Sequence, residues 1–287
     1  REFAPRIGIV TNLAPDHLDR YPSLAAYYAD KQRLFLNARP HDSWVLNGED
    51  AAVLQLAAGV RGRHYVVRVD STPEPWESGG FVVEDRLVLR SSGGVWDLVG
   101  TDELQLLGPH NWFNALAAAV AASLAGAPVE AIREGLRSFA PLEHRLEPVG
   151  VVDGVLWIND SKATNIASTL VALRSMTRPT VLLLGGRHKG TPYTELLPEL
   201  RSQVRAVVAY GEAGEIVEQD LARHVVVERE RGGFEAVIER AAALAQPGDA
   251  VLISPACSSF DMFSSYEERG RRFKELVRER EEATRGA

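Results

Sequence analysis

The segment Trp157-Ile158-Asn159-Asp160-Ser161-Lys162-Ala163-Thr164-Asn165 begins apolar and ends in a carboxylate, two hydroxyls, an ammonium and two amides. The run from Val155 to Ile158 favours a buried strand. The apolar-periodic segment from Ile166 to Leu173 predicts a helix, for which Thr164 or Asn165 is a suitable N-cap. The polar cluster is therefore expected at the C-terminal edge of a strand.

Such an edge attracts anions. Free backbone amides and the positive end of the helix dipole point there, so phosphates and carboxylates are the expected ligands. The simpler interpretation is structural: Thr164 closes the helix and Lys162 is solvated. For a single loop this is the more common arrangement, so the functional interpretation depends on the other motifs of the chain.

The composition is that of a globular protein. The chain has 287 residues, 45% hydrophobic and 25% charged, which is long enough for two domains. Its net charge of -7 argues against a generic nucleic-acid or membrane-surface binder. The single cysteine, Cys257, excludes an internal disulfide framework and suits a reducing compartment. No apolar run approaches the roughly 18 residues of a membrane span, and the start carries no signal-peptide pattern, so we expect a cytoplasmic protein.

The chain begins without Met, and a strand-like run from Arg6 to Asn12 follows almost at once. A single first strand of a parallel sheet needs neighbours, which we expect upstream. We therefore interpret the sequence as a possible fragment that begins inside a domain.

A helix is predicted from its cap Ser23 to Phe35, and Lys31 falls in line with its apolar face. An ammonium there is costly unless it is paired or neutralised. The ordinary explanation, which the sequence favours, is a lysine whose stem lies on the apolar face while its ammonium reaches solvent, or one that is salt-bridged, with Asp16 and Asp19 as candidate partners. The alternative is a lysine of lowered pKa that takes up CO2 as a carbamate and becomes a metal-binding anion.

Strands and helices then alternate up to a Pro/Ser/Gly-rich loop at residues 71–80. Three short antiparallel strands follow it, which we interpret as a small excursion from the main sheet. The Gly108-Pro109 turn opens an alanine-rich helix on which Asn111 and Asn114 share a face. Amides can pair with a nucleobase edge, although an asparagine near a helix start is more often a cap.

A candidate hinge at residues 140–147 precedes a second series of alternating strands and helices, which predicts a doubly wound sheet. Polar loops follow three of its strands, at residues 160–165, 185–190 and 254–263. We expect them to converge on one sheet edge as an anion-binding crevice. The Gly185-Gly186 pair lacks the GxGxxG spacing of a dinucleotide fold, so that alternative is weak.

Taken together, these motifs resemble the ATP-dependent Mur ligases. Residues 12–22 with Lys31, and residues 108–114, are similar to segments of the family's central domain. Residues 160–165 and 254–270 resemble the MurD type, which adds D-glutamate; family members that add a diamino acid or a dipeptide differ there.

The resemblance implies an α/β fold in two parts. Residues 1–141 would be the C-terminal portion of the central, ATPase-like domain that binds ATP. Residues 142–287 would be the doubly wound, Rossmann-like C-terminal domain.

The resemblance also implies roles for individual residues. The expected catalytic residues, which would also hold a magnesium ion, are His17 and carbamylated Lys31. The expected adenine contacts are Asn111 and Asn114, and the expected ribose and phosphate contacts are Arg145, Asp160 and Lys162. The expected contacts of the incoming D-glutamate are Thr164, Lys189, Ser259 and Phe260, with Tyr266 close by.

The implied activity is ligation of D-glutamate to UDP-N-acetylmuramoyl-L-alanine, with ATP and Mg2+, through an acyl-phosphate. Such a step belongs to peptidoglycan precursor synthesis, and through it to cell wall biogenesis, cell shape, cell division and the cell cycle. We expect a cytoplasmic monomer that contacts neither nucleic acid nor membrane.

One expected motif is missing, because no GxxxxGK[ST]-like phosphate loop occurs in the 287 residues. We therefore expect this chain alone to be inactive. A competing interpretation is a non-catalytic ligand-binding or regulatory module that keeps the glutamate crevice. A third is a folylpolyglutamate-type ligase, against which the segment at residues 160–165 argues.

Overall fold

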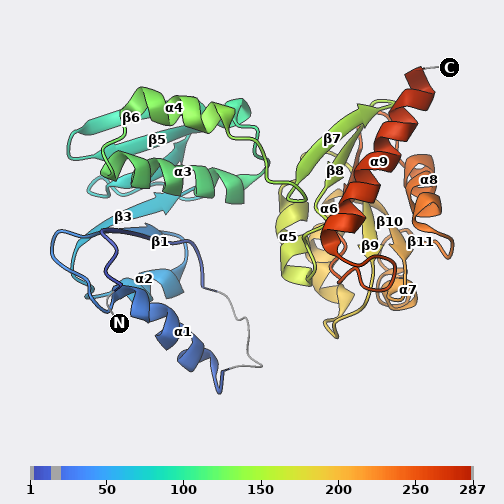
Figure 1. Ribbon diagram of the computed structural model, residues 1–287, viewed down its shortest axis with the longest axis horizontal. Helices are drawn as coiled ribbons and strands as arrows, with labels where there is room; N and C mark the ends of the chain where they lie inside the picture. The colour runs from blue at the N-terminus through green and yellow to red at the C-terminus, as the bar shows by residue number, and fades with distance from the viewer. Residues whose placement is uncertain (1–2, 14–20, 286–287) are drawn as a thin grey trace. The chain divides into compact units, whose positions relative to one another are not determined.

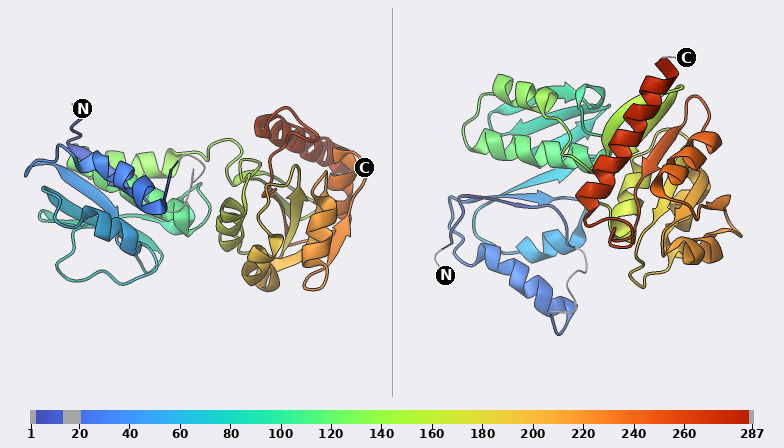
Figure 2. Two further views of the ribbon diagram at one scale, coloured as in Figure 1. Left: turned by 90° about the horizontal axis from the view of Figure 1, so that it is seen from below. Right: turned by 45° about the vertical axis from the view of Figure 1, so that its right-hand side comes forward.

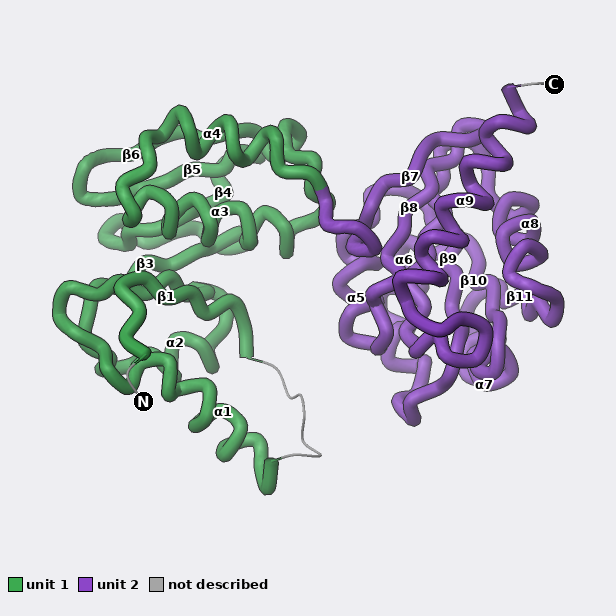
Figure 3. The backbone as a smooth tube through the Cα atoms, viewed as in Figure 1, with its two compact units in different colours: residues 1–140 green, residues 141–287 purple. Residues whose placement is uncertain are grey.

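The computed structural model describes residues 3–13 and 21–285. The chain forms two compact units, Arg1–Ala140 and Pro141–Ala287 (Figure 3). Each unit contains one six-stranded sheet with helices packed on it (Figure 1). This is the mixed α/β fold that the sequence predicts.

The sheet of the first unit has the order β1-β2-β3-β4-β5-β6. Strands β1 to β4 run parallel, and β5 and β6 complete the sheet antiparallel. The three short strands thus continue the main sheet, and the expected excursion from it is wrong. Gly79, the first residue of β4, has a φ of 150°, and a Cβ there would overlap the backbone of Val66 in β3. The pairing of β4 with β3 therefore requires a residue without a side chain at this position. The strands are β1 (Ile7–Val10), β2 (Ser43–Asn47), β3 (Arg63–Arg68), β4 (Gly79–Val83), β5 (Arg86–Ser91) and β6 (Gly94–Gly100).

Alternation along β2 divides the helices of this unit between the two faces of the sheet. Trp44 and Leu46 pack with Phe35 and Val53, whereas Val45 points to the other face and packs against the helix that begins at Pro109. Figure 1 shows the corresponding layers. One face carries α1 (Leu24–Gln32), η1 (Arg33–Phe35) and α2 (Ala51–Ala57), and the other carries α3 (Pro109–Leu124) and α4 (Val129–Ser138); the short η2 (Thr101–Glu103) follows β6.

The sheet of the second unit has the order β11-β10-β9-β12-β8-β7, parallel except for β7. Every residue of β9 is buried, as expected for a strand covered on both faces. The strands are β7 (Glu147–Val152), β8 (Val155–Asn159), β9 (Thr180–Gly185), β10 (Val204–Tyr210), β11 (Val227–Arg229) and β12 (Ala250–Ile253).

Helices cover both faces of this second sheet, which confirms the predicted doubly wound arrangement (Figure 2). One core cluster joins alternate strand residues such as Leu183 and Ile253 to Val237 and Phe273. Helices α8 (Phe234–Leu244) and α9 (Tyr266–Arg285) supply that face. The other face is covered by α5 (Ile166–Arg174), η3 (Tyr193–Leu196), α6 (Leu197–Gln203) and α7 (Gly214–Leu221).

Two of the predicted helix caps are confirmed. The hydroxyl of Ser23 accepts a hydrogen bond from Ala26 N at the start of α1, and the amide oxygen of Asn165 accepts one from Ser168 N at the start of α5. Thr164 is therefore not the cap of α5. Over the described ranges, every helix is too short or too polar to serve as a transbilayer segment.

Candidate functional site

Three loops leave the C-terminal ends of neighbouring strands in the second unit. Strands β9, β12 and β8 are adjacent in the sheet and parallel, so the loops at residues 186–192, 254–265 and 160–165 leave the sheet side by side. The predicted convergence of these loops on one edge is thus seen in the structure.

Backbone hydrogen bonds join the three loops directly. Ala256 N donates to Ala163 O at 3.0 Å, which ties the loop after β12 to the loop after β8. Arg187 N donates to Ser258 O at 2.9 Å and forms an isolated antiparallel bridge, which ties the loop after β12 to the loop after β9. The loop after β12 is therefore the centre of the edge, with the other two fixed on either side.

Arg269, on α9, also joins two of these loops, through its side chain. Its side chain is 0% exposed, and its Nε and Nη2 atoms donate to Ser161 Oγ at 2.9 Å and Ser161 O at 2.7 Å. The guanidinium also donates to Cys257 O, at 3.3 Å from Nη1. These partners are a hydroxyl and two carbonyls rather than a carboxylate, so the positive charge beneath the loops is not neutralised by them. The guanidinium therefore both holds two loops together and favours anions at the edge.

Lys162 is the cation of the loop after β8. Its Nζ lies 3.0 Å from the hydroxyl of Tyr266 and 4.7 Å from the centre of the tyrosine ring. The ring also meets His144 edge-on, with the two ring centres 6.0 Å apart. Tyr266 thus restrains an ammonium that the structural interpretation of the sequence left free in solvent.

Asp160 is buried beneath the same loop. Its carboxylate accepts hydrogen bonds from Leu146 N at 3.2 Å and from Ser254 Oγ at 2.8 Å. Burial raises the pKa of Asp160 to about 7, and the two hydrogen bonds and Arg145 oppose this rise. Both carboxylate oxygens of this expected ribose contact thus accept hydrogen bonds from within the protein.

Arg145 lies in a short segment of unusual backbone. His144 and Leu146, on either side of it, have φ angles of 66° and 42°, which non-glycine residues seldom adopt. His144 N donates to Glu147 Oε2 at 3.0 Å, and Leu146 N donates to Asp160. A partly buried and a buried carboxylate thus hold the backbone on either side, while the side chain of Arg145 is exposed and available to a ligand.

The four expected contacts of D-glutamate differ in exposure. Lys189 is exposed, Thr164 is partly exposed, and Phe260 is 62% exposed, which is unusual for so large an apolar ring. Ser259 is only 2% exposed. The structure therefore brings all four residues to the same edge. Three of the side chains are accessible to a ligand there, whereas Ser259 is almost completely buried.

The expected metal site is described only in part. His17 lies outside the described residues. Lys31 lies one turn after Tyr27, with its Nζ 5.2 Å from the centre of that ring, so it is in line with the buried residue of α1 as predicted. The side chain is nevertheless exposed, so its ammonium is not buried. Only Tyr27 is buried on α1, and the buried stripe is too narrow to include the lysine. Across residues 3–13 and 21–285, no three His, Cys, Asp or Glu side chains group closely enough to hold a metal ion.

The two asparagines of the first unit interact with each other. Asn111 Nδ2 donates to Leu107 O at 2.8 Å, and Asn114 Nδ2 donates to Asn111 Oδ1 at 3.4 Å. Asn111 thus closes the turn before α3 as a donor to a backbone carbonyl. The cap predicted as the structural alternative is wrong, because Gly108 is the N-cap of α3 and has no side chain to cap that helix. Asn114 is exposed.

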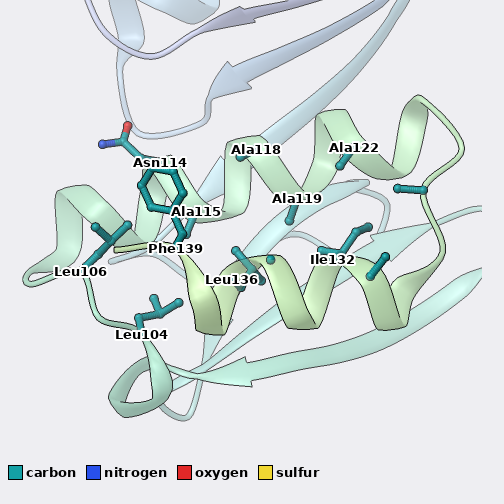
Figure 4. A pocket seen from close by; sticks show the side chains of 13 residues that line it. Leu104, Leu106, Asn114, Ala115, Ala118, Ala119, Ala122, Ile132, Leu136 and Phe139 are labelled. Carbon is teal, nitrogen blue, oxygen red and sulfur yellow. The ribbon is translucent and has the colours of Figure 1, made fainter. Parts of the chain in front are cut away.

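Asn114 also stands at one end of an apolar pocket of about 360 Å³ between α3 and α4. Figure 4 shows its amide directed away from α4 and from the alanine side chains of the pocket. Most of the lining is aliphatic, and it includes Ala115, Ala118, Ala119, Ala122, Ile132, Leu136 and Phe139.

Sequence reasoning missed Arg269 as a residue of this edge. A signal was present, because Arg269 precedes Phe273, Leu276 and Val277 by four, seven and eight positions, which is the spacing of one helix face. An arginine in register with three buried apolar residues was therefore a candidate for burial.

Two family models match the chain. The Mur ligase middle domain matches residues 1–122, and the Mur ligase glutamate ligase domain matches residues 144–257. Solved structures with a similar fold include a pseudomurein peptide ligase type C from Methanothermus fervidus, with a TM-score of 0.68 and 17% identity over 96% of this chain and 63% of that one. MurC from Thermotoga maritima gives a TM-score of 0.67 at 18% identity, over 97% and 61%. At these identities the likeness concerns the fold alone.

Curated relatives are much closer in sequence. The UDP-N-acetylmuramoylalanine--D-glutamate ligase of Salinibacter ruber is 44% identical over 277 residues, and that of Symbiobacterium thermophilum is 40% identical over 285. Each match covers 96% of this chain and 60% of the relative, so the chain spans about three fifths of their length. With these MurD-type relatives and both domain models matched, the chain belongs to the Mur ligase family.

Proposed function

We propose that the complete protein containing this chain is an ATP-dependent ligase of the MurD type. It would join D-glutamate to UDP-N-acetylmuramoyl-L-alanine in peptidoglycan precursor synthesis. The names of the relatives at 40% and 44% identity support the substrate pair. Residues 1–141 would form the end of the ATP-binding middle domain and residues 142–287 the domain that receives the amino acid.

The observation that carries this proposal is the shared sheet edge in the second unit. Lys162 and Lys189 supply cations from loops on either side of the loop after β12. The buried guanidinium of Arg269 adds positive charge beneath them. An edge of this kind suits phosphates and the two carboxylates of an acidic amino acid.

The proposed reaction has two steps. A carboxylate oxygen of the nucleotide-sugar substrate attacks the γ-phosphorus of ATP, and ADP leaves. The amino group of D-glutamate then attacks the acyl carbon, phosphate leaves, and the amine loses a proton as the amide forms. We assign Lys162, Asp160 and Arg145 to the ribose and phosphates, and Asn111 and Asn114 to adenine.

The amino acid would bind at the remaining positions of the edge. Thr164 and Lys189 are exposed enough to contact its carboxylates, and Phe260 would cover its backbone. Ser259, although largely buried, would contact the carboxylate at the opposite end from Lys189, and Tyr266 would keep Lys162 in place. By holding D-glutamate in one orientation, these contacts would direct its amino group toward the acyl carbon that it attacks.

A magnesium ion would offset negative charge on the transferred phosphoryl group. We propose His17 and carbamylated Lys31 as its ligands. The described residues do not form a metal site by themselves, so no step is assigned through the ion. Because Lys31 is exposed, CO2 can reach it, and carbon-13 NMR of the protein in labelled bicarbonate tests for the carbamate.

Phosphate release by the complete protein tests the function. The assay contains ATP, magnesium, UDP-N-acetylmuramoyl-L-alanine and one of a panel of amino acids. Turnover with D-glutamate alone is expected. Turnover with another amino acid instead would identify a different ligase, and no turnover with any of them would support the binding-module alternative.

Residues 1–287 alone provide the second half of this test. We propose that they release no phosphate above background, since they contain no GxxxxGK[ST] loop to hold the nucleotide phosphates. Substrate-dependent turnover by this chain would refute that. We also propose a cytoplasmic monomer, which light scattering after gel filtration tests with respect to oligomeric state.

A further inference from the structure

The hydroxyl of Tyr193 lies between two of the three loops of the edge. Tyr193 is 1% exposed and begins η3, which directly follows the loop after β9. Its hydroxyl oxygen lies 2.6 Å from Cys257 Sγ and 3.3 Å from His188 Nδ1. One buried group therefore contacts both loops.

Tyr193 is itself anchored at its backbone. Its N atom donates to Asp220 Oδ2 on α7 at 2.9 Å. Its ring also packs on His188, with the two ring centres 5.3 Å apart. These contacts fix the position of the Tyr193 ring and therefore of its hydroxyl. A shift of Cys257 relative to Tyr193 would break their contact or displace the loop after β9 with it.

The two contacts lie next to proposed ligands of D-glutamate. His188 immediately precedes Lys189, and Cys257 comes two residues before Ser259. The Arg187 and Ser258 backbones already pair at one point between these loops. The tyrosine adds a second, side-chain connection, and two connections fix both the separation and the angle of the loops.

The connection is a neutral hydrogen bond near pH 7. Burial raises the pKa of Tyr193 and also that of Cys257, so both groups keep their protons. Neither group is placed to act as a nucleophile or a base. Their common effect is geometric.

We infer that Tyr193 is a positioning residue that sets the distance between Lys189 and Ser259, and thereby the length of acidic amino acid that the edge accepts. This rests on the proposed function. If Lys189 and Ser259 hold the two ends of the amino acid, the distance between them selects its length. Glutamate is longer than aspartate by one methylene. In a hydrophobic pocket, a difference of one methylene is worth roughly 10- to 200-fold in specificity.

Tyr193→Phe in the complete protein tests this inference, because it removes the hydroxyl and keeps the ring. We expect the KM for D-glutamate to rise on the order of 10-fold, the KM for ATP to stay within about 2-fold, and the preference for D-glutamate over D-aspartate to fall several-fold. A variant that only loosened the core would change both KM values together.

Tyr210→Phe is the matched control. Tyr210 is also 1% exposed and ends the neighbouring strand β10, but its hydroxyl, although near Arg269, reaches no hydrogen-bond partner in the described part of the chain. It should leave the D-glutamate to D-aspartate ratio unchanged. Equal ratios in wild type and Tyr193→Phe, or equal changes in the two Tyr→Phe variants, would overturn the inference.

Cys257→Ala breaks the same contact from the other side. It should reproduce the loss of preference, and the double variant with Tyr193→Phe should lose no more than either single variant. Full additivity would contradict a shared connection. The wild-type assay separates this test from the function itself: if wild type does not use D-glutamate, the proposed function fails before any variant is compared.

Discussion

The Nζ atom of Lys162 is held by Tyr266 in two ways at once, by a hydrogen bond of 3.0 Å to the hydroxyl and by a position 4.7 Å from the ring centre. Tyr266→Phe removes only the first contact, and Tyr266→Leu removes both. We expect ATP to bind the complete protein roughly 3- to 10-fold more weakly in the Phe variant, and more weakly still in the Leu variant. Isothermal titration with ATP measures the series.

Tyr210→Phe is the control for this series as well, because it removes a buried hydroxyl from the same unit, at the end of β10, and leaves the Lys162–Tyr266 contact intact. Its affinity for ATP should equal that of wild type. An unchanged affinity in both Tyr266 variants would show that the lysine is positioned without the tyrosine.

The ionisation of Asp160 should make the second unit lose stability as pH rises. Folding raises the pKa of this carboxyl from 3.8 to about 7, so the folded state favours the protonated form. The stabilisation is fully present below pH 3.8 and is lost as pH rises through about 7. In that window the free energy of unfolding should fall by up to about 1.4 kcal/mol per pH unit from this group.

Asp160→Asn isolates the effect, since the amide is neutral at every pH. Urea denaturation of wild type and variant at several pH values should show the difference in unfolding free energy moving in favour of the variant between about pH 4 and pH 7, by a few kcal/mol. A difference that does not depend on pH would show that folding does not raise the pKa of Asp160.

The strands and the convergent loops could be predicted because their causes are local. β12 and all but the ends of β9 are continuous apolar runs, both strands are buried at every position, and each is followed by a polar loop. In a parallel sheet the ends of such strands share an edge, so the sequence was enough to bring Lys162 and Lys189 to the same side.

The sequence shows less about side chains whose surroundings are set by the tertiary fold. Lys31 has helical spacing with apolar residues, but the buried stripe of α1 includes only Tyr27, and the tertiary packing that decides this is not encoded in the helix alone. The spacing of Arg269 on its helix marks it as a candidate for burial, but it cannot show its partners, because Ser161 and Cys257 lie on loops that only the fold brings to it. Pattern periodicity shows which face is buried, but not which polar group will find a partner there.

Gly135 on α4 should be replaceable by alanine with a gain in stability. It lines the apolar pocket, and no atom outside its own helix lies within 4 Å of the position that a Cβ would take. Alanine in a helix interior is favoured over glycine by roughly 0.5–1 kcal/mol. Urea denaturation should therefore show a higher midpoint for the first unit.

Gly270 on α9 is the opposite case and serves as the comparison. A Cβ there would overlap the ring of His144 at Nδ1, and the ring is buried with little room to move. Gly270→Ala should destabilise the second unit by about 1–3 kcal/mol. Equal effects at the two glycines would mean that helix propensity, and not the packing of His144, decides the outcome.

Arg269→Lys should show that the shape of the guanidinium matters as well as its charge. A lysine ammonium keeps the charge but cannot donate along the separate directions that reach Ser161 O and Cys257 O. Because one buried carbonyl loses its donor, we expect the free energy of unfolding of the second unit to fall by about 1–3 kcal/mol.

Arg272→Lys, on the same helix, is the control: its partners Glu235 and Glu279 are exposed, so the change should stay within about 0.5 kcal/mol. The hydrogen-exchange rates of the amides at residues 161–163 and 256–258 should rise only in the Arg269 variant, because the guanidinium joins those two loops. Unchanged rates would mean that the backbone hydrogen bonds between the loops hold them together without Arg269.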